Sequence, residues 1–157
     1  IELGPTSNVE SRVLLANAGQ DITVQDVTVT EGALFQAGDL IMINGTLSAP
    51  ADTGSMQFFS SNIEVETNSS ITAHDILFFN QSGGAGLYGG TDVEDGSIYS
   101  LGSGELLNLH GTNLTFITDS PGVAGRAMSL RNLALMVGGS ATGQLAGDGA
   151  VTFQSNA

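Results

Sequence analysis

Two ten-residue stretches decide the fold: MQFFSSNIEV, residues 56–65, and LNLHGTNLTF, residues 107–116. Both place alternating apolar residues on either side of an asparagine. Every second side chain of a strand faces the same way, and asparagine tolerates the backbone of a sharp bend. Each stretch therefore predicts two short strands that meet at a corner. The aligned pairs are Met56–Leu107, Phe58–Leu109, Asn62–Asn113, Ile63–Leu114 and Val65–Phe116.

The same pattern recurs along the chain. Copies begin near residues 13, 33, 56, 76, 107, 128 and 151, mostly about 20–23 residues apart with one gap of about 31. Self-similarity at a fixed period of this size marks a solenoid. Because glycine is abundant and no amphipathic helix is evident, we predict an all-β parallel β-helix of about six to seven rungs.

Stacking of successive rungs predicts which side chains form the core. Equivalent inward residues should lie over one another, with the asparagines or aspartates between strands at the corners. A β-sandwich or jelly roll is the alternative fold, since it also has many short strands. The residues expected to face inward are Leu15, Ile22, Val24, Ala33, Phe35, Leu40, Met42, Met56, Phe58, Ile63, Val65, Ile76, Phe78, Met128, Leu130, Leu133, Leu135, Val151 and Phe153.

Charge and composition exclude several classes of partner. The 157 residues include sixteen acids, three arginines and no lysine, for a net charge of −13. This balance argues against nucleic acid and anionic membrane surfaces, which attract basic proteins. No apolar run is long enough for membrane insertion, and there is no cysteine for disulfides or thiolate chemistry. The expected partners are copies of the chain itself, or the glycans and proteins of a host or neighbouring cell surface.

Deviations from the repeat suggest the domain organisation. Residues 1–12 precede the first copy and are expected to form an N-terminal cap or arm. Residues 13–157 form a single β-helix domain. The long gap in the repeat predicts a glycine-rich loop insertion at about 81–104, because extra residues in a solenoid rung leave as a loop on one face. The chain begins at Ile1, so removal of a preceding segment is also expected.

The insertion contains the one candidate metal site. Asp92, Glu94 and Asp95 could supply oxygen ligands to Ca²⁺, which binds six to eight oxygens. The nearby glycines lack the aspartate of the calcium-binding β-roll nonapeptide, since Tyr88 follows Leu87. We therefore expect no cofactor and no metal, with Ca²⁺ at these three acids as the alternative to a solvated acidic loop.

No catalytic residues are predicted. Glu64 and Glu66 alternate along one strand at a separation of about 7 Å, which is compatible with glycoside hydrolysis, but such acids also protect exposed strands. His74 and His110 are the two histidines, and both are expected in turns. No nucleophile elbow accompanies them, so we predict that the chain is not an enzyme.

Four Asn-x-Ser/Thr sequons could carry glycans if the protein passes through a glycosylating pathway. Two of them fall at or near predicted corners, where a structural role for the asparagine is the alternative. The four asparagines are Asn44, Asn68, Asn80 and Asn113.

Short motifs resemble those of the polymorphic outer-membrane proteins, which are autotransported β-helix adhesins. Residues 76–80 (ILFFN), followed by 83–85 (GGA), are similar to the FxxN and GGA[ILV] tetrapeptides of that family, with Gly86 at the aliphatic position. Residues 59–62 (FSSN) and 153–156 (FQSN) match FxxN. The resemblance implies a right-handed parallel β-helix displayed at a cell surface.

Together these features predict a non-catalytic extracellular or cell-surface protein that is structural or adhesive. A surface passenger segment, a filament subunit or a fibre subunit would act through self-association or cell-surface contact. One alternative is a glycan-binding or glycan-cleaving β-helix, for which Tyr88 and Tyr99 are the aromatic residues in the predicted loop. The other is a viral capsid-decoration or fibre protein, which a sandwich fold would favour.

Overall fold

The chain is a parallel β-solenoid, as the repeat predicted. The computed structural model describes residues 2–3, 10–81, 87–90, 99–102, 108–119, 129–131 and 150–156. Every pairing between the described strands is parallel, which rules out a sandwich of antiparallel sheets. No helix in these ranges is long and apolar enough to cross a membrane.

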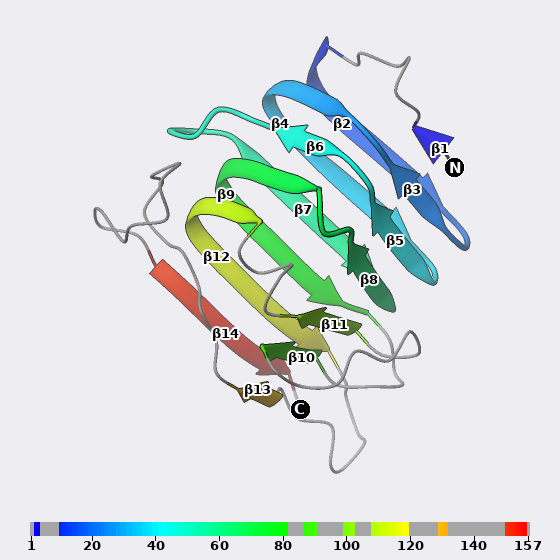
Figure 1. Cartoon of the computed structure of the whole chain (residues 1–157), viewed down its shortest axis with the longest axis vertical. Coiled ribbons are helices and arrows are strands. Elements are labelled where there is room, and N and C mark those ends of the chain that lie inside the picture. Colours follow the sequence, from blue (N-terminus) through cyan, green and yellow to red (C-terminus); the bar gives the residue numbers. More distant parts are fainter. Residues whose placement is uncertain are drawn as a thin grey trace.

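The strands form three sheets that follow the coil (Figure 1). The long sheet has seven strands: β2 (Glu10–Ala18), β4 (Val27–Ala37), β6 (Thr46–Ser48), β7 (Ser55–Ser60), β9 (Ser70–Asn80), β12 (Leu109–Asp119) and β14 (Ala150–Asn156). A four-stranded sheet contains β1 (Glu2–Leu3), β3 (Ile22–Val24), β5 (Leu40–Ile43) and β8 (Asn62–Val65). The third sheet contains β10 (Leu87–Gly90), β11 (Tyr99–Gly102) and β13 (Ser129–Arg131).

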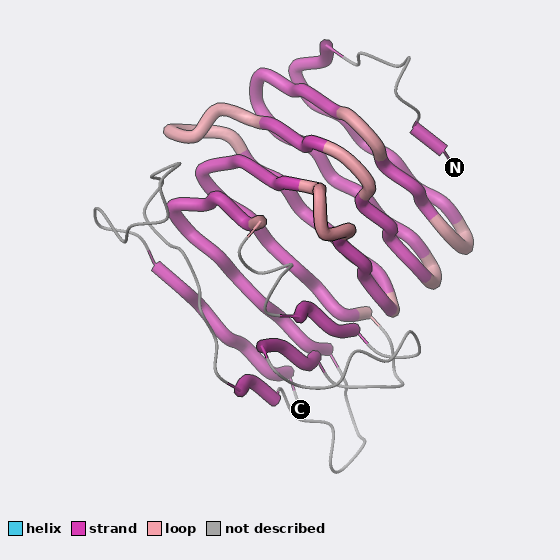
Figure 2. The backbone as a smooth tube through the Cα atoms, viewed as in Figure 1, coloured by secondary structure: helices cyan, strands magenta, loops and turns pink. Residues whose placement is uncertain are grey.

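The longest strands each turn a corner. Along β4, Val27 and Val29 are buried, Thr30 and Glu31 are both exposed, and burial then resumes at Gly32. Two consecutive exposed residues break the alternation, so the strand bends there and begins a new face. The regular turns are joined by short loops at their other corners, as the tube in Figure 2 shows.

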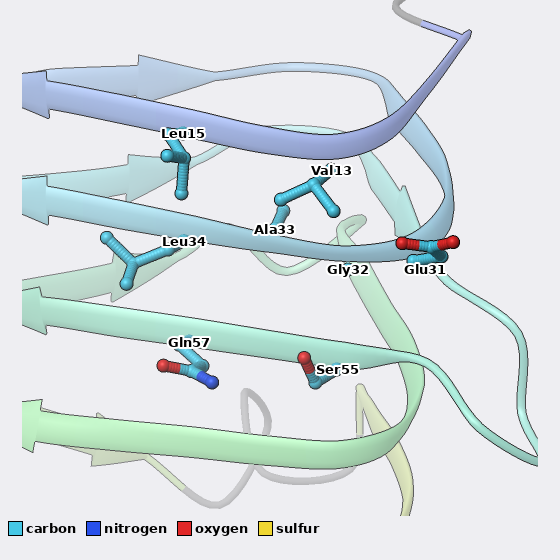
Figure 3. Close-up of a pocket in the computed structure, with 8 residues that line it drawn as sticks. All are labelled: Val13, Leu15, Glu31, Gly32, Ala33, Leu34, Ser55 and Gln57. Atoms are coloured by element: carbon cyan, nitrogen blue, oxygen red, sulfur yellow. The ribbon is translucent and has the colours of Figure 1, made fainter.

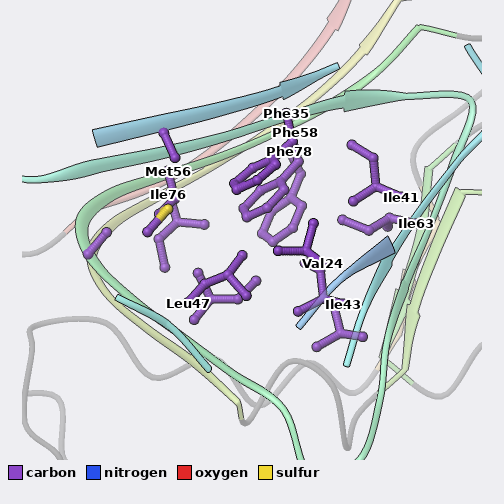
Figure 4. Packing of buried hydrophobic residues seen from close by; sticks show 14 of the residues in the cluster. Val24, Phe35, Ile41, Ile43, Leu47, Met56, Phe58, Ile63, Ile76 and Phe78 are labelled. Carbon is purple, nitrogen blue, oxygen red and sulfur yellow. The ribbon is translucent and has the colours of Figure 1, made fainter. Parts of the chain in front are cut away.

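A column of phenylalanines runs through the core. Phe35, Phe58, Phe78 and Phe116 are in register on adjacent strands and are fully or almost fully buried. Their neighbouring rings stack with centroids 5.2–5.5 Å apart, within the range of favourable aromatic contacts. Figure 4 shows the first three of these rings between the aliphatic side chains of the other faces. The predicted stacking of Phe35, Phe58 and Phe78 is therefore confirmed.

The predicted rung spacing holds only in the first half. Phe58 follows Phe35 after 23 residues, and Phe78 follows Phe58 after 20. The next two spacings are longer: 38 residues from Phe78 to Phe116 and 37 from Phe116 to Phe153. About three regular turns result, fewer than the six to seven expected. The copy predicted near residue 128 does not lie in the long sheet, because β12 pairs directly with β14 while β13 pairs with β10.

The alignment that first suggested the repeat was wrong in register. Phe58 pairs with Phe78, and Phe78 pairs with Phe116, whereas Leu109 lies beside Ile71. The cause is that Asn113 and Asn62 occupy different corners. Asn113 lies at the bend within β12, while Asn62 begins β8 after the opposite corner. Both corners have apolar residues on either side of a polar residue, so the sequence pattern does not distinguish them.

Three residues expected in the core face outward instead. Leu15 is 72% exposed, and Ala16 takes the inward position. Leu40 and Met42 are only partly buried, while their neighbours Ile41 and Ile43 are buried. The corner that precedes β5 has one residue more than the corner that precedes β8. The inward positions of β5 are therefore shifted by one residue, from Leu40 and Met42 to Ile41 and Ile43.

Parts of the predicted cap and insertion join the sheets. From the cap, Glu2 and Leu3 pair with β3, and β2 already begins at Glu10. From the insertion, β10 and β11 pair with each other in parallel. The rest of the glycine-rich segment, residues 82–86, 91–98 and 103–107, lies outside the described residues.

Removing one ring from the column is expected to destabilise the fold strongly. Phe58→Ala should lower the free energy of unfolding by about 3–5 kcal/mol, the usual loss for a buried phenylalanine. The control is Phe59→Ala, which removes an outward ring paired with Phe79 and should cost about 1 kcal/mol. Urea unfolding followed by circular dichroism measures both; equal losses would contradict the assignment of inward and outward rings.

A corner glycine offers a second matched test. A Cβ at Gly38 would lie 2.1 Å from the carbonyl oxygen of Gly19, whereas a Cβ at Gly19 would meet nothing within 4 Å. Gly38→Ala should therefore destabilise the protein by about 1–3 kcal/mol through overpacking, and Gly19→Ala should leave stability nearly unchanged. Thermal unfolding compares the two, and a fully tolerated alanine at residue 38 would show that the corners do not stack this closely.

Candidate functional site

The outer face of the long sheet is the surface best suited to contact a partner. We define the outer face as the outward side chains of two rows that cross β2, β4, β7, β9, β12 and β14. The first row is Leu15, Leu34, Gln57, Leu77, Thr115 and Thr152, and the second is Asn17, Gln36, Phe59, Phe79, Ile117 and Gln154. The parallel register fixes both rows.

Neither row contains a charged residue, although the chain carries sixteen acids. Together the two rows combine apolar side chains with amide and hydroxyl side chains instead. Phe59 and Phe79 stack with their ring centroids 5.2 Å apart, and the side-chain amide of Asn17 donates a hydrogen bond to Gln36 Oε1 over 3.3 Å. The outer face is therefore a neutral strip on a strongly acidic molecule.

A groove of about 240 Å³ lies at one end of this strip (Figure 3). Val13 and Leu15 from β2 line one side of it, and Leu34 and Gln57 lie on the next two strands. Gly32 lies between them, and a Cβ there would approach the Ser55 carbonyl and hydroxyl oxygens to 2.7 Å. The missing side chain thus opens the groove, whose walls are mainly apolar.

The charged group of the groove is already paired. Glu31 lies at its corner end, where its carboxylate accepts hydrogen bonds from the Arg12 guanidinium, one of them from Nε over 2.8 Å. Both side chains are exposed, so the pair contributes little to stability. The groove can bury apolar surface, and its ends offer the Ser55 hydroxyl and the Gln57 amide as hydrogen-bonding groups.

The two histidines lie on adjacent strands rather than in free turns. His74 is part of the corner of β9, where Nδ1 lies 3.3 Å from the Ala51 carbonyl oxygen. Its neighbour Asp75 accepts a hydrogen bond of 2.7 Å from the Asn113 side chain. His110 is partly buried in β12 beside Thr72. These contacts hold two consecutive corners together.

The glutamates considered in the sequence, Glu64 and Glu66, lie on β8 and just beyond its end. Glu64 is exposed, and Glu66 lies in the turn that leads to Ser69. Neither lines the groove. Asp92, Glu94 and Asp95 lie outside the described residues, so the structure does not test calcium binding there. Elsewhere in the described ranges, no group of three or more potential metal ligands occurs.

The four sequon asparagines differ in exposure. Asn44 and Asn68 are exposed in turns, and Asn113 is partly buried at the corner of β12. Asn80 is fully buried and pairs in register with Ser60, which is also fully buried. A glycan on Asn80 would have to occupy the core.

The outer face was not recognised in the sequence. All four residues 13–16 (VLLA) are apolar, so the alternation of apolar and polar residues could not decide whether Leu15 or Ala16 faces inward. The signal in the sequence was the number of residues in each corner. One extra residue in a corner reverses which side chains of the adjoining strand face inward. The expectation that Phe58 is the inward phenylalanine of its rung was correct, and its neighbour Phe59 faces outward.

No protein-family model, curated protein or solved structure matches this chain.

Glycosylation can test the burial of the sequons. When the chain is secreted from a eukaryotic host, the folded fraction should carry glycans at Asn44 and Asn68 and none at Asn80, because Asn80 has no exposed surface. Peptide mass spectrometry measures the occupancy of each site. Occupied Asn80 in folded protein would contradict its position in the core.

Proposed function

We propose that the chain is a non-catalytic structural and adhesive protein that acts outside the cell or at its surface. It would work by associating with copies of itself and by contacting neighbouring surface glycans or proteins. The observation that carries this proposal is the outer face, a strip of twelve positions without charge on a chain of net charge −13.

Electrostatics supports contact through this strip. Copies with a charge of −13 repel each other, and exposed charges interact over about one Debye length, ~8 Å at physiological salt. A face that keeps acids away from its centre reduces the local repulsion and the cost of removing charges from water. Exposed Leu15 and the partly buried Leu34, Phe59 and Phe79 supply apolar area to bury.

The size of the strip limits the strength of a single contact. Six strands at ~4.8 Å spacing, each contributing two outward residues and so about four residues of length at ~3.3 Å, span roughly 380 Å². A stable interface typically buries about 800 Å² on each partner. One outer face therefore supports a weak contact, and firm association requires many such faces side by side.

Glycan binding is the second candidate. The observation that favours it is the position of Phe59 and Phe79 beside Gln36, since apolar rings next to amide groups are a common composition for neutral ligand sites. This arrangement lies on the same outer face, so the two functions share one surface.

Leu34→Glu is the variant that tests the proposed function. It places a charge within the strip, beside the groove, and should weaken concentration-dependent association by about tenfold or more. Thr28→Glu is the matched control, because Thr28 is exposed on the same strand but outside the two rows. Sedimentation velocity over a concentration series measures association, and circular dichroism confirms that both variants fold.

Two outcomes would count against the proposal. The first is a chain that stays monomeric at every concentration and binds no cell surface. The second is turnover of a polysaccharide, which would make the protein an enzyme.

A further inference from the structure

The last strand of the long sheet leaves its inward side chain uncovered. Among the strands that the structure describes, β14 and β2 are the outermost of that sheet. Phe153 on β14 continues the phenylalanine column, with its ring stacked on Phe116 at a centroid distance of 5.3 Å. Unlike the four rings before it, Phe153 is 42% exposed. The column therefore reaches one edge of the sheet with an open aromatic ring.

The opposite edge carries a small residue at the equivalent position. Ala16 on β2 lies in register with Phe35 and faces inward. Phe35 is 0% exposed, so a strand with alanine at this position is enough to close the column over a phenylalanine ring. Leu14 and Ala18, also on β2, pack partly against the core on either side of Ala16.

We propose that a second copy of this chain adds its β2 to β14 as a parallel strand. This inference rests on the proposed self-association and assigns it a surface and a register. Ala16 of the added copy covers Phe153, repeating the contact that Ala16 makes with Phe35 within one chain. In the same register, Asn17 lies beside Gln154 and Leu15 lies beside Thr152.

The edge strands themselves favour this pairing. Soluble proteins usually protect exposed edges with charged residues or proline, but β14, with the sequence AVTFQSN, has neither. β2 contains one acid and one base, Glu10 and Arg12, so its formal charge is zero. Pairing of the two strands therefore brings no net charge of the same sign together, although the chain as a whole is acidic.

Repetition of this contact produces a filament. The two edges are different surfaces, so the interface is heterologous, and such contacts extend indefinitely when the rotation does not close a ring. The parallel rows of the outer face would then run on from one copy to the next. The weak contact of each outer face would be multiplied along the filament.

Cysteine cross-linking tests the register directly, because the chain contains no cysteine. Asn17→Cys and Gln154→Cys, combined in one chain, replace two exposed outward residues. Within one chain these positions are five strand spacings apart, roughly 24 Å. Between paired copies their Cα atoms would be ~4.8 Å apart, inside the range that a disulfide can bridge.

The matched control shifts one cysteine by two residues along the same face. Asn17→Cys with Thr152→Cys places the Cα atoms ~8 Å apart in the proposed register, too far for a disulfide. Mild oxidation and non-reducing electrophoresis should give a ladder of dimers, trimers and larger species for the first pair. The control pair should give at least tenfold less cross-linked product.

A second variant pair tests the contact without oxidation. Phe153→Glu should lower self-association at least tenfold, whereas Thr28→Glu, which lies on β4 outside the outer face and on neither edge strand, should lower it far less. Both variants add the same charge to the chain. Equal effects would overturn the proposal, because the charge and not the column would then control association.

The outcomes separate this inference from the proposed function. If sedimentation shows oligomers but the Asn17/Gln154 cysteine pair forms no ladder, the proposed edge contact is wrong and self-association stands. If both cysteine pairs cross-link equally, no defined register exists and the edge contact is again wrong. A chain that remains monomeric at all concentrations contradicts the edge contact, and it contradicts the proposed function as well if it also binds no cell surface.

Discussion

Stacking of inward side chains between parallel strands is the interaction on which the rest of the structure depends. Phe58, Phe78 and Phe116 each lie against a ring above and a ring below, and the centroid distances along the column stay between 5.2 and 5.5 Å. Strands in a parallel sheet are ~4.8 Å apart, so the rings follow the backbone spacing with little freedom. The corners must match this spacing, and at Gly38 no side chain fits between two turns.

The same register that aligns the rings also aligns the outward residues. Because side chains alternate along a strand, an inward Phe58 places its neighbours Gln57 and Phe59 outward. The equivalent neighbours in the other turns face outward for the same reason. Charges then gather at the corners, as with the exposed Glu31 and Asp75, while the centre of the outer face stays neutral. Core packing and surface chemistry are therefore two consequences of one alternation, and we infer that the protein acts through extended surfaces.

Sequence alone predicted the solenoid and the stacking of Phe35, Phe58 and Phe78, because their spacing and alternation are regular. It did not predict the phase of Leu15, Leu40 and Met42, since a corner that is one residue longer reverses which side chains face inward. The ring of Phe116 was missed for a related reason: the bend at Asn113 resembles the opposite corner in sequence. The candidate site depends on these phases, so most of it could be recognised only in the structure.

Nuclear magnetic resonance with selectively labelled phenylalanine rings tests the central claim most directly. The stacked column predicts nuclear Overhauser contacts from Phe58 to both Phe35 and Phe78, and from Phe116 to both Phe78 and Phe153. It also predicts no contact between Phe58 and Phe116, which lie two strands apart. A missing contact between Phe78 and Phe116, or short Hα–Hα contacts typical of antiparallel neighbours, would contradict the parallel solenoid.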